Sequence, residues 1–332
     1  MPILPLARGL EASTDPPVDD KPQAARRRWG FNKGGPSRRG SASALQSRAA
    51  WVLALPFMLL FAVFTAGPVI SSLYFSVTDI KSRDLRSPFA VAFVGLQNYA
   101  HVFADDRFRQ AAFNTAYFVV IGVPLTLGIA LAAALALNTG ITKFRTMFRV
   151  GYYTPVVTSI VAVAVVWRFL LREDVGLVNT VLHWVGVQGP DWLGSTTWAM
   201  PSLIVMASWR NFGTGMIIFL AGLQSVPVML HEAAAIDGAS SWQRFRYITV
   251  PLLRPTILFL TVTTGIGYLQ FFEEPFVMTA GGPLDSTVSM SMFTYQQFGF
   301  GNYGFASATS YVLFVIIVCL TAVQFRFLRS NT

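Results

Sequence analysis

Residues 112–138 read AFNTAYFVVIGVPLTLGIALAAALALN, and no side chain in this stretch carries a formal charge. A helix needs about 20 predominantly apolar residues to cross the hydrocarbon core of a bilayer, so the stretch is long enough to span a membrane. Five further runs along the chain have the same apolar character. The six runs cover residues 51–78, 112–138, 150–171, 198–223, 255–278 and 306–328. The sequence therefore predicts an all-α polytopic membrane protein with six transmembrane helices.

The composition agrees with lipid as the main solvent of this chain. Hydrophobic residues make up 53% of the 332 residues and charged residues 12%, whereas about a quarter of the residues are charged in an ordinary soluble domain. The net charge of +9 is compatible with a nucleic-acid-binding protein, but the basic residues gather in an N-terminal tail and in short segments between apolar runs. That distribution is typical of membrane topology. We therefore expect membrane lipid as a partner and no nucleic acid.

Two regions follow from this pattern. Residues 1–48 are rich in Pro, Gly, Ser and Arg and lack apolar periodicity, which predicts a disordered basic tail; residues 49–332 are predicted to form the transmembrane domain. With six spans, both termini lie on one side. That side carries 17 Lys and Arg residues, and the opposite side carries six. The positive-inside rule therefore predicts a multi-pass protein of the cytoplasmic membrane with both termini in the cytoplasm.

Several catalytic and metal-binding patterns are absent from the sequence. It contains no G-x-x-x-x-G-K-[ST] phosphate loop, so we expect this chain to bind no ATP in that manner. Its three histidines and one cysteine are widely separated, and no metal site is predicted. Neither a G-x-S-x-G motif nor a cluster of His and carboxylate side chains at one depth is present. An enzyme embedded in the membrane is therefore disfavoured.

One segment between the fourth and fifth runs has the pattern of two short helices joined by a tight corner. Residues 226–255 read VPVMLHEAAAIDGASSWQRFRYITVPLLRP. Pro227 suits the first turn of a helix, and Asp237-Gly238 is a turn pair. Ser240 or Ser241 can cap a second helix. We expect a positive φ at Gly238. A cytoplasmic helix–turn–helix knob with small alanines on one side is suited to enter a groove of another protein.

The same segment resembles the EAA loop of ABC importer permeases. Glu232-Ala233-Ala234, then Gly238, Ile248 and Val250-Pro251 match the spacing E-A-A-x3-G-x9-I-x-L-P, with valine where leucine is usual. The resemblance implies a type I ABC importer transmembrane domain whose loop 226–255 docks into a separate ATPase; we call this segment the coupling loop. The residues expected to couple the two proteins are Glu232, Ala233, Ala234, Asp237, Gly238, Trp242, Ile248 and Pro251.

Further motifs are similar to the carbohydrate branch of that family. They are FVGLQNY at 93–99, DVGLVN at 174–179, TAGGP at 279–283, and YQQF at 295–298 with YGFASA at 303–308. The chain also ends just after the sixth run, which resembles the first of two paired permeases, the maltose-F-type subunit. The resemblance implies four partners: a second, homologous permease in a heterodimer, two ATPase subunits or one ATPase homodimer, an extracytoplasmic solute-binding protein, and ATP with Mg bound by the ATPase. No cofactor is expected on this chain.

Polar side chains interrupt the fourth and fifth runs. Such groups are costly at bilayer depth and are candidates for a substrate pathway. The candidates are Trp209, Arg210, Asn211, Thr214, Tyr268, Gln270, Glu273 and Glu274. Gln270 and Glu273 are three residues apart and are predicted to share a helix face. Interhelical hydrogen bonding by Gln270 and an ion pair between Glu273 and Arg210 remain the structural alternatives. In the second run, Gly128, Ala132 and Ala136 form a small-residue row that favours close helix packing.

These observations favour one function over three alternatives. We predict a permease subunit of an ATP-driven ABC importer that translocates a sugar, such as an oligosaccharide, by alternating access. A self-sufficient secondary carrier or channel is an alternative, but no inverted repeat is evident and the coupling loop is present. A non-sugar solute such as glycerol phosphate is the second alternative. A membrane-embedded enzyme is the third, and we expect the chain to have no enzymatic activity.

Overall fold

The computed structural model describes residues 39–139 and 145–328, and the chain divides into two compact units, residues 1–60 and 61–332. Residues 1–38, most of the predicted tail, lie outside the described residues. Helix α1 (Arg39–Phe61) begins inside the predicted tail and supplies the whole described part of the first unit. Its large apolar side chains are exposed, with Leu53 at 80% and Phe57 at 72%. Such a surface suits a lipid environment.

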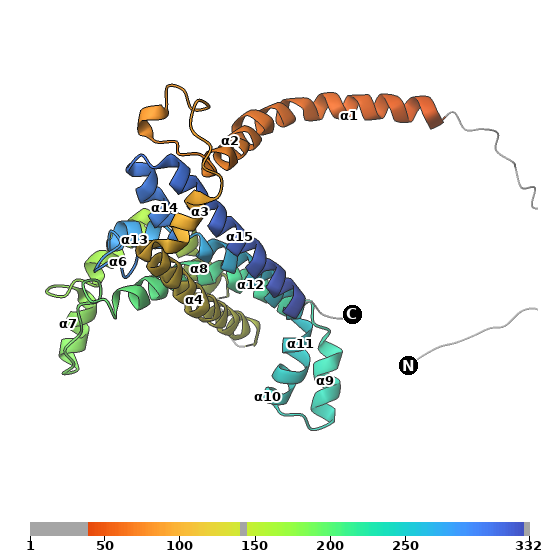
Figure 1. The fold of residues 1–332 in the computed structure, drawn as a ribbon. Coiled ribbons are helices and arrows are strands. Elements are labelled where there is room, and N and C mark those ends of the chain that lie inside the picture. Colours follow the sequence, from red (N-terminus) through yellow and green to blue (C-terminus); the bar gives the residue numbers. More distant parts are fainter. Residues whose placement is uncertain (1–38, 140–144, 329–332) are drawn as a thin grey trace, which may run out of the picture. The chain divides into compact units, whose positions relative to one another are not determined.

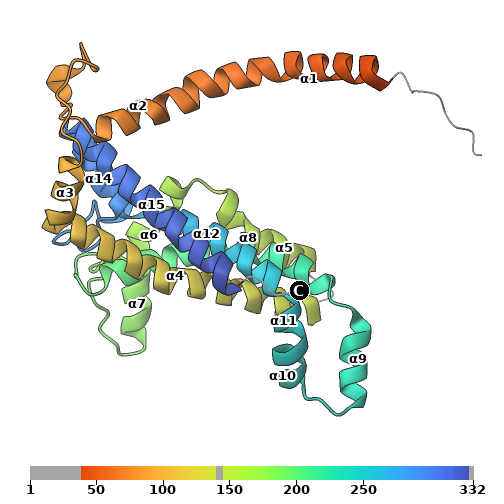
Figure 2. The same cartoon turned by 45° about the vertical axis from the view of Figure 1, so that its right-hand side comes forward.

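The second unit continues in helices and short helical turns, and one isolated β-bridge joins Thr78 and Phe93. The elements are η1 (Ala62–Ala66), α2 (Gly67–Ser76), η2 (Ser82–Asp84), α3 (Gln97–Ala104), α4 (Asp106–Thr139), α5 (Arg145–Val157), α6 (Ile160–Leu170), α7 (Leu177–Trp184), α8 (Ala199–Gln224), α9 (Val228–Ile236), α10 (Ser241–Arg244), η3 (Phe245–Thr249), α11 (Val250–Leu252), α12 (Arg254–Leu269), α13 (Glu273–Met278), α14 (Met290–Gly299) and α15 (Tyr303–Leu328). Figures 1 and 2 show α9, α10 and α11 projecting from one end of this unit, away from α3, α7 and α14.

The described residues contain four helical stretches long and apolar enough to cross a membrane, or six when each of two bent helix pairs counts as one span. The four single spans are Ala50–Ser76, Asp106–Asn138, Ala199–Gln224 and Tyr303–Arg326. They correspond to the first, second, fourth and sixth predicted runs. The predicted all-α membrane fold is confirmed, and the third and fifth runs differ from the prediction in being broken.

The third run is not one helix over 150–171. The segments Met147–Val157 and Ile160–Leu170 are bent by 97°. Pro155 removes a backbone donor close to the break, and Ser159 has an extended ψ of 127°. The hydroxyl group of Thr158 donates to the carbonyl of Thr154 at 2.9 Å. Hydropathy could not show this break because the residues on both sides of it are apolar.

The fifth run, predicted as a helix over 255–278, also ends early. Helix α12 stops at Leu269, and α13 starts only at Glu273, after Phe272 with φ of −143°. The ring of Phe271 in this break stacks on Phe118 of α4, with centroids 3.9 Å apart. Burying that ring turns the chain out of the helix and into the core. Gln270 and Glu273 therefore do not share a helix face, and that prediction was wrong.

Close packing of α4 against α8 forms the centre of the unit. Ala130 of α4 is fully buried. A Cβ added to Gly215 of α8 would lie 2.9 Å from the Cβ of Ala130. The predicted packing row of Gly128, Ala132 and Ala136 is exposed within the chain instead. Small residues do set the closest approach in this interface, as they do between membrane helices in general. The sequence row chosen for that role lies on another face of α4.

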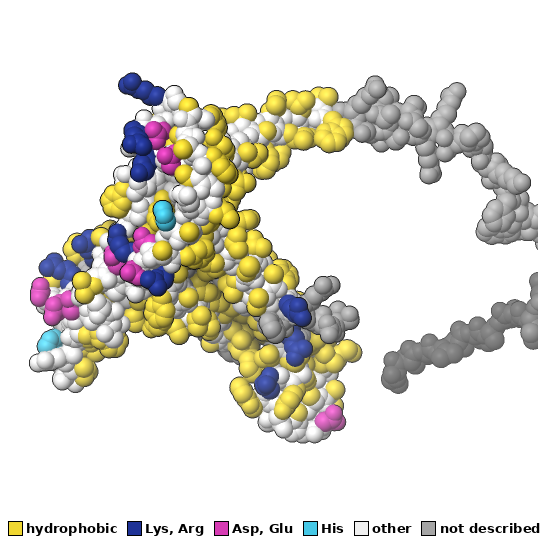
Figure 3. All heavy atoms as spheres, viewed as in Figure 1, with side chains coloured by type: hydrophobic (Ala, Val, Ile, Leu, Met, Phe, Trp, Pro, Cys, Tyr) yellow, Lys and Arg dark blue, Asp and Glu magenta, His cyan; other side chains and the backbone are white. Residues whose placement is uncertain are grey.

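Charged side chains are sparse along the flank of the second unit. On the face shown in Figure 3 they gather at two ends, and the band between them is hydrophobic. The chain at one end carries Arg244 of α10, Arg246 of η3 and Arg254 at the start of α12. At the other end, Arg107 of α4 forms a bidentate ion pair with Asp285, with N–O distances of 2.9 and 3.0 Å. An apolar band between two charged ends is the arrangement that a bilayer requires.

Candidate functional site

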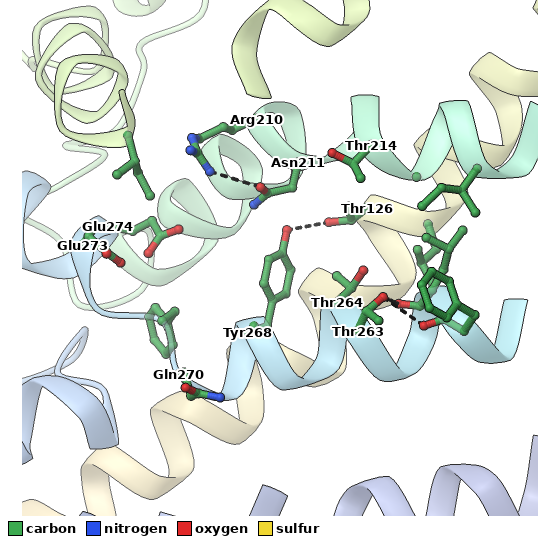
Figure 4. A pocket seen from close by; sticks show the side chains of 18 residues that line it. Thr126, Arg210, Asn211, Thr214, Thr263, Thr264, Tyr268, Gln270, Glu273 and Glu274 are labelled. Atoms are coloured by element: carbon green, nitrogen blue, oxygen red, sulfur yellow. Dashed lines mark hydrogen bonds between the residues drawn. The ribbon is translucent and has the colours of Figure 1, made fainter. Parts of the chain in front are cut away.

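A cavity of about 520 Å³ lies between α4, α8, α12 and the break before α13, and we call it the pathway pocket (Figure 4). Its wall mixes hydroxyl, amide and charged groups with aromatic and aliphatic side chains. The lining residues are Thr126, Leu127, Ile160, Arg210, Asn211, Thr214, Gly215, Ile218, Phe259, Leu260, Thr263, Thr264, Gly267, Tyr268, Gln270, Phe271, Glu273 and Glu274. Volumes of about 300–1,000 Å³ are usual for pockets that hold small molecules.

A buried hydroxyl network joins three helices beside this pocket. The Tyr268 hydroxyl on α12 lies 2.8 Å from Oγ1 of Thr126 on α4, and Thr126 donates to Oγ of Ser208 on α8 at 3.0 Å. The Tyr268 ring meets the edge of Phe118, with centroids 5.0 Å apart. Gly122 permits this approach, since a Cβ there would lie 2.9 Å from the Tyr268 ring. The network fixes the relative positions of the pocket's three walls.

We expect Tyr268→Phe to lower the stability of the folded chain. The substitution removes one buried hydroxyl–hydroxyl bond, which costs about 1 kcal/mol and lowers the unfolding temperature by about 2–4 °C. Thermal unfolding of the purified protein in detergent measures the shift. Tyr295→Phe is the matched control, because the structure gives the Tyr295 hydroxyl no hydrogen bond among the described residues. An unchanged unfolding temperature for Tyr268→Phe would contradict the role of the network.

Two charged side chains, Glu274 and Arg210, face the pathway pocket without forming an ion pair. Glu274 is only 5% exposed, and its Oε2 has no hydrogen-bond partner among the described residues. Arg210 donates from Nη1 to Oδ1 of Asn211 at 3.2 Å, and its buried Nε likewise has no partner there. The predicted ion pair between Glu273 and Arg210 is not among the ion pairs of the described residues. Figure 4 shows Arg210 and Glu274 at the same side of the pocket.

The structure brings seven of the eight predicted pathway candidates to this cavity. The exception is Trp209, which lies outside the lining and packs against Trp167, with ring centroids 5.6 Å apart. Gln270 faces the cavity while its Nε2 donates to the carbonyl of Ile266 at 3.3 Å. Sequence reasoning missed Thr126, Thr263 and Thr264, because a single hydroxyl group in an apolar helix carries little signal. Thr264 lies four residues before Tyr268 on α12, and that helical spacing was the clue available for Thr264.

The coupling loop folds as two helices around a glycine corner. Helix α9 ends in a paired cap in which Gly238 N–H donates to Ala235 O and Ala239 N–H donates to Ala234 O at 2.8 Å. Such a cap requires a left-handed residue, and Gly238 has φ of +80°. Ser240 then caps α10, exchanging hydrogen bonds with Gln243. The positive φ and the serine cap are confirmed. Pro227 lies at the N-cap of α9 and not in its first turn.

An open groove of about 340 Å³ crosses this corner. Its lining is Ala234, Asp237, Gly238, Ala239, Gln243, Arg244, Tyr247 and Ile248. Large apolar side chains of the same loop are exposed, with Ile236 at 87% and Trp242 at 69%. Four of the predicted coupling residues therefore line the groove. Glu232 and Ala233 are exposed on α9, Trp242 packs on Phe245 at 5.5 Å between centroids, and Pro251 lies in α11.

Comparison with known proteins identifies the family of the chain that carries the pathway pocket and the coupling loop. Residues 125–330 match the family model described as binding-protein-dependent transport system inner membrane component. The lactose transport system permease protein LacF of Rhizobium radiobacter is 35% identical, over 85% of this chain and 94% of LacF. The trehalose/maltose transport system permease protein MalF of Thermococcus litoralis is 31% identical, over 85% and 94%. The arabinooligosaccharides permease AraP of Halalkalibacterium halodurans is 34% identical, over 82% and 85%.

A solved structure shares the fold. It is a chain of a bacterial ABC transporter involved in the import of the acidic polysaccharide alginate, with a TM-score of 0.73, 24% identity, and coverage of 88% of this chain and 98% of that one. The matched residues 125–330 include every residue that lines the pathway pocket and the whole coupling loop. This chain therefore belongs to the binding-protein-dependent transport system inner membrane components, the multi-pass permeases of ABC importers.

Proposed function

We propose that this chain is the permease subunit that carries a neutral sugar or short oligosaccharide through the cytoplasmic membrane in an ATP-driven importer. The observation that carries the proposal is the pathway pocket, in which hydroxyl, amide and aromatic groups converge between three membrane helices. A sugar presents many hydroxyl groups and apolar ring faces, and this lining offers partners for both. Named permeases among its relatives are those of transport systems for lactose, arabinooligosaccharides, trehalose or maltose, and sulfoquinovosyl glycerol.

The charges of the pocket favour a neutral sugar over glycerol phosphate. Its charged lining residues are one arginine, Arg210, and two glutamates, Glu273 and Glu274. Two carboxyl groups against one guanidinium give the lining no excess of positive charge. A phosphate monoester would therefore lack a counter-charge at bilayer depth, where charge interactions are strong. A neutral polyhydroxylated solute needs no such counter-charge.

The mechanism we infer is alternating access driven from the coupling loop. The exposed rim of Ile236, Trp242 and Tyr247 around the α9–α10 corner offers an apolar contact for an ATPase groove. Movement of that corner reaches the pocket directly, because the helical stretch Ser241–Leu252 continues into α12 through a 66° bend. Helix α12 carries Thr263, Thr264 and Tyr268 into the pocket wall. A shift of the loop would therefore reposition one wall relative to the others.

The proposed assembly contains this chain, a second permease, two ATPase subunits or an ATPase homodimer, and an extracytoplasmic solute-binding protein. ATP and Mg would be bound by the ATPase. Both termini of this chain would face the cytoplasm, on the same side as the coupling loop. A related importer structure is described in complex with an alginate pentasaccharide-bound periplasmic protein, which supports a soluble delivery protein as a partner.

Uptake of radiolabelled sugars by the native host tests the proposal. The panel comprises lactose, trehalose, maltose and arabinotriose, with glycerol 3-phosphate as the competing solute. We expect deletion of this gene to abolish uptake of at least one sugar, and the intact gene supplied in trans to restore it. If the deletion leaves uptake of all four sugars unchanged and removes uptake of glycerol 3-phosphate, the transported substrate is that anion and not a sugar.

We further expect Gln270→Ala to weaken sugar transport without uncoupling the ATPase. Gln270 faces the pocket beyond the last turn of α12, where its amide can bind a ligand hydroxyl group. One such hydrogen bond contributes about 0.5–1.5 kcal/mol to binding. Its loss should therefore lower transport several-fold at low sugar concentration. Uptake against sugar concentration, with sugar-stimulated ATP hydrolysis measured in parallel, provides the test. If uptake at every concentration matches wild type, Gln270 is a packing group.

A further inference from the structure

Glu274 and Arg210 are unusual within the pathway pocket because each buries a polar atom that nothing in the described chain satisfies. Oε2 of Glu274 and Nε of Arg210 are both buried and without a hydrogen-bond partner among the described residues. Nearly all buried polar groups in folded proteins have a partner, since an unsatisfied one costs free energy. Of the two residues, Glu274 is the more deeply buried, at 5% exposure. Both residues line the same cavity.

The fold keeps these two charges apart although they could neutralise each other. They come from different elements, Arg210 from the middle of α8 and Glu274 from the first turn of α13. Arg210 is directed by its bond to Asn211. Glu274 is held by the Phe271 turn, which stacks on Phe118 and pins the start of α13 to α4. Opposite charges held in one polar cavity without contact leave room for a group that both donates and accepts hydrogen bonds.

We propose that Glu274 and Arg210 are the specificity-determining pair of this permease, and that a neutral sugar bridges them. In the bridged state a sugar hydroxyl group donates to the Glu274 carboxylate, and a hydroxyl or ring oxygen of the same sugar accepts from the Arg210 guanidinium. The carboxylate disfavours solutes with an acidic group at that end of the pocket. The inference rests on the proposed function and adds to it the residues that read the charge of the solute.

Direct binding to the intact transporter tests the proposal without the selectivity of the solute-binding protein. The complex is co-purified with this chain from the native host, placed in nanodiscs, and titrated without the binding protein. The probes are the radiolabelled panel sugar that wild type takes up fastest and the acidic disaccharide digalacturonate. We expect Glu274→Gln to weaken binding of the neutral sugar about 10-fold or more, the scale set by removing a charged hydrogen-bond partner. The same variant should bind digalacturonate more tightly than wild type does.

Arg210→Gln should shift the two probes differently. The variant should bind the neutral sugar more weakly than wild type does, by a similar factor. It should also bind digalacturonate more weakly than wild type does, because the remaining lining charges are both negative. Opposite changes for the acidic probe in the two single variants are not expected from a merely structural role. Glu173→Gln, an exposed glutamate outside this pocket, is the matched control and should leave both affinities unchanged. If Glu274→Gln fails to accumulate, Glu274→Asp should retain the preference for the neutral probe.

Three outcomes overturn the proposal while the sugar permease assignment stands. The first is a Glu274→Gln variant whose sugar uptake and whose binding of both probes match those of wild type. The second is an equal loss of binding affinity for both probes in both single variants. The third is recovery of abundance and neutral-sugar binding in the Arg210→Gln/Glu274→Gln double variant, which would make the pair a structural one. Loss of the assignment itself would be seen elsewhere, as sugar uptake in the native host that does not depend on this gene.

Discussion

Gly238→Asp is expected to abolish sugar uptake while the protein still accumulates in the membrane. The positive φ of +80° at this corner costs a residue with a side chain about 1–2 kcal/mol. A Cβ at Gly238 meets no atom within 4 Å, so the chain itself has space for the new side chain. The damage falls on the outer surface of the coupling loop, where a charged group would enter the groove rim offered to the ATPase. Uptake and ATPase co-purification, measured together, should both be lost.

The controls for this prediction separate backbone strain from the partner surface. Gly186 has φ of +78° and likewise meets no atom within 4 Å, but it follows α7 at the opposite end of the unit. Gly186→Asp should therefore keep uptake close to wild type. Glu232→Lys, a charge reversal on exposed α9 that leaves the corner intact, should abolish uptake as Gly238→Asp does. Wild-type uptake with normal ATPase retention in Gly238→Asp would show that this loop is not the coupling element.

Gly213→Leu is expected to reduce the amount of folded protein several-fold and to remove uptake with it. A Cβ at Gly213 on α8 would lie 2.3 Å from the carbonyl oxygen of Tyr152 and 3.2 Å from Cα of Tyr153, both in α5. These are backbone atoms, so the two helices must separate to admit any side chain. Overpacking of this kind costs about 1–3 kcal/mol or more, and losses of that size change cellular abundance several-fold. Quantitative immunoblotting of membranes and size-exclusion profiles in detergent report the effect.

Gly128→Leu on α4 is the matched control for this helix crossing. Gly128 is exposed, and a Cβ there meets no atom within 4 Å. The same change in side chain should leave abundance close to that of wild type. Equal losses in the two variants would mean that the α5–α8 crossing is not what makes Gly213 intolerant. Gly213→Ala should show an intermediate loss, because even one methyl carbon is too close to the Tyr152 carbonyl.

The spans and the coupling loop could be predicted from sequence because each depends on local properties. Apolar runs of membrane-crossing length are a property of composition, and four of them correspond to single helices. The Asp237-Gly238 corner and the Ser240 cap depend on residues within a few positions of one another. Local backbone preferences of Gly and Ser decide such features before any tertiary contact forms. Family resemblance in the same segment then indicated the partner class.

The broken helices and the walls of the pathway pocket depend on contacts between distant residues. The Phe271 ring leaves α12 because Phe118, far earlier in the chain, offers it a stacking surface, and no local pattern records that. Thr126 became a pocket residue only when α4 packed beside α8 and α12. Polarity alone selected Arg210 and Glu274 as candidates, and it also selected Trp209, which packs elsewhere. Sequence thus determined the membrane helices and the glycine corner, since short-range preferences suffice for both. Tertiary packing alone decided which polar groups face one cavity, because that depends on how helices remote in sequence are rotated against each other.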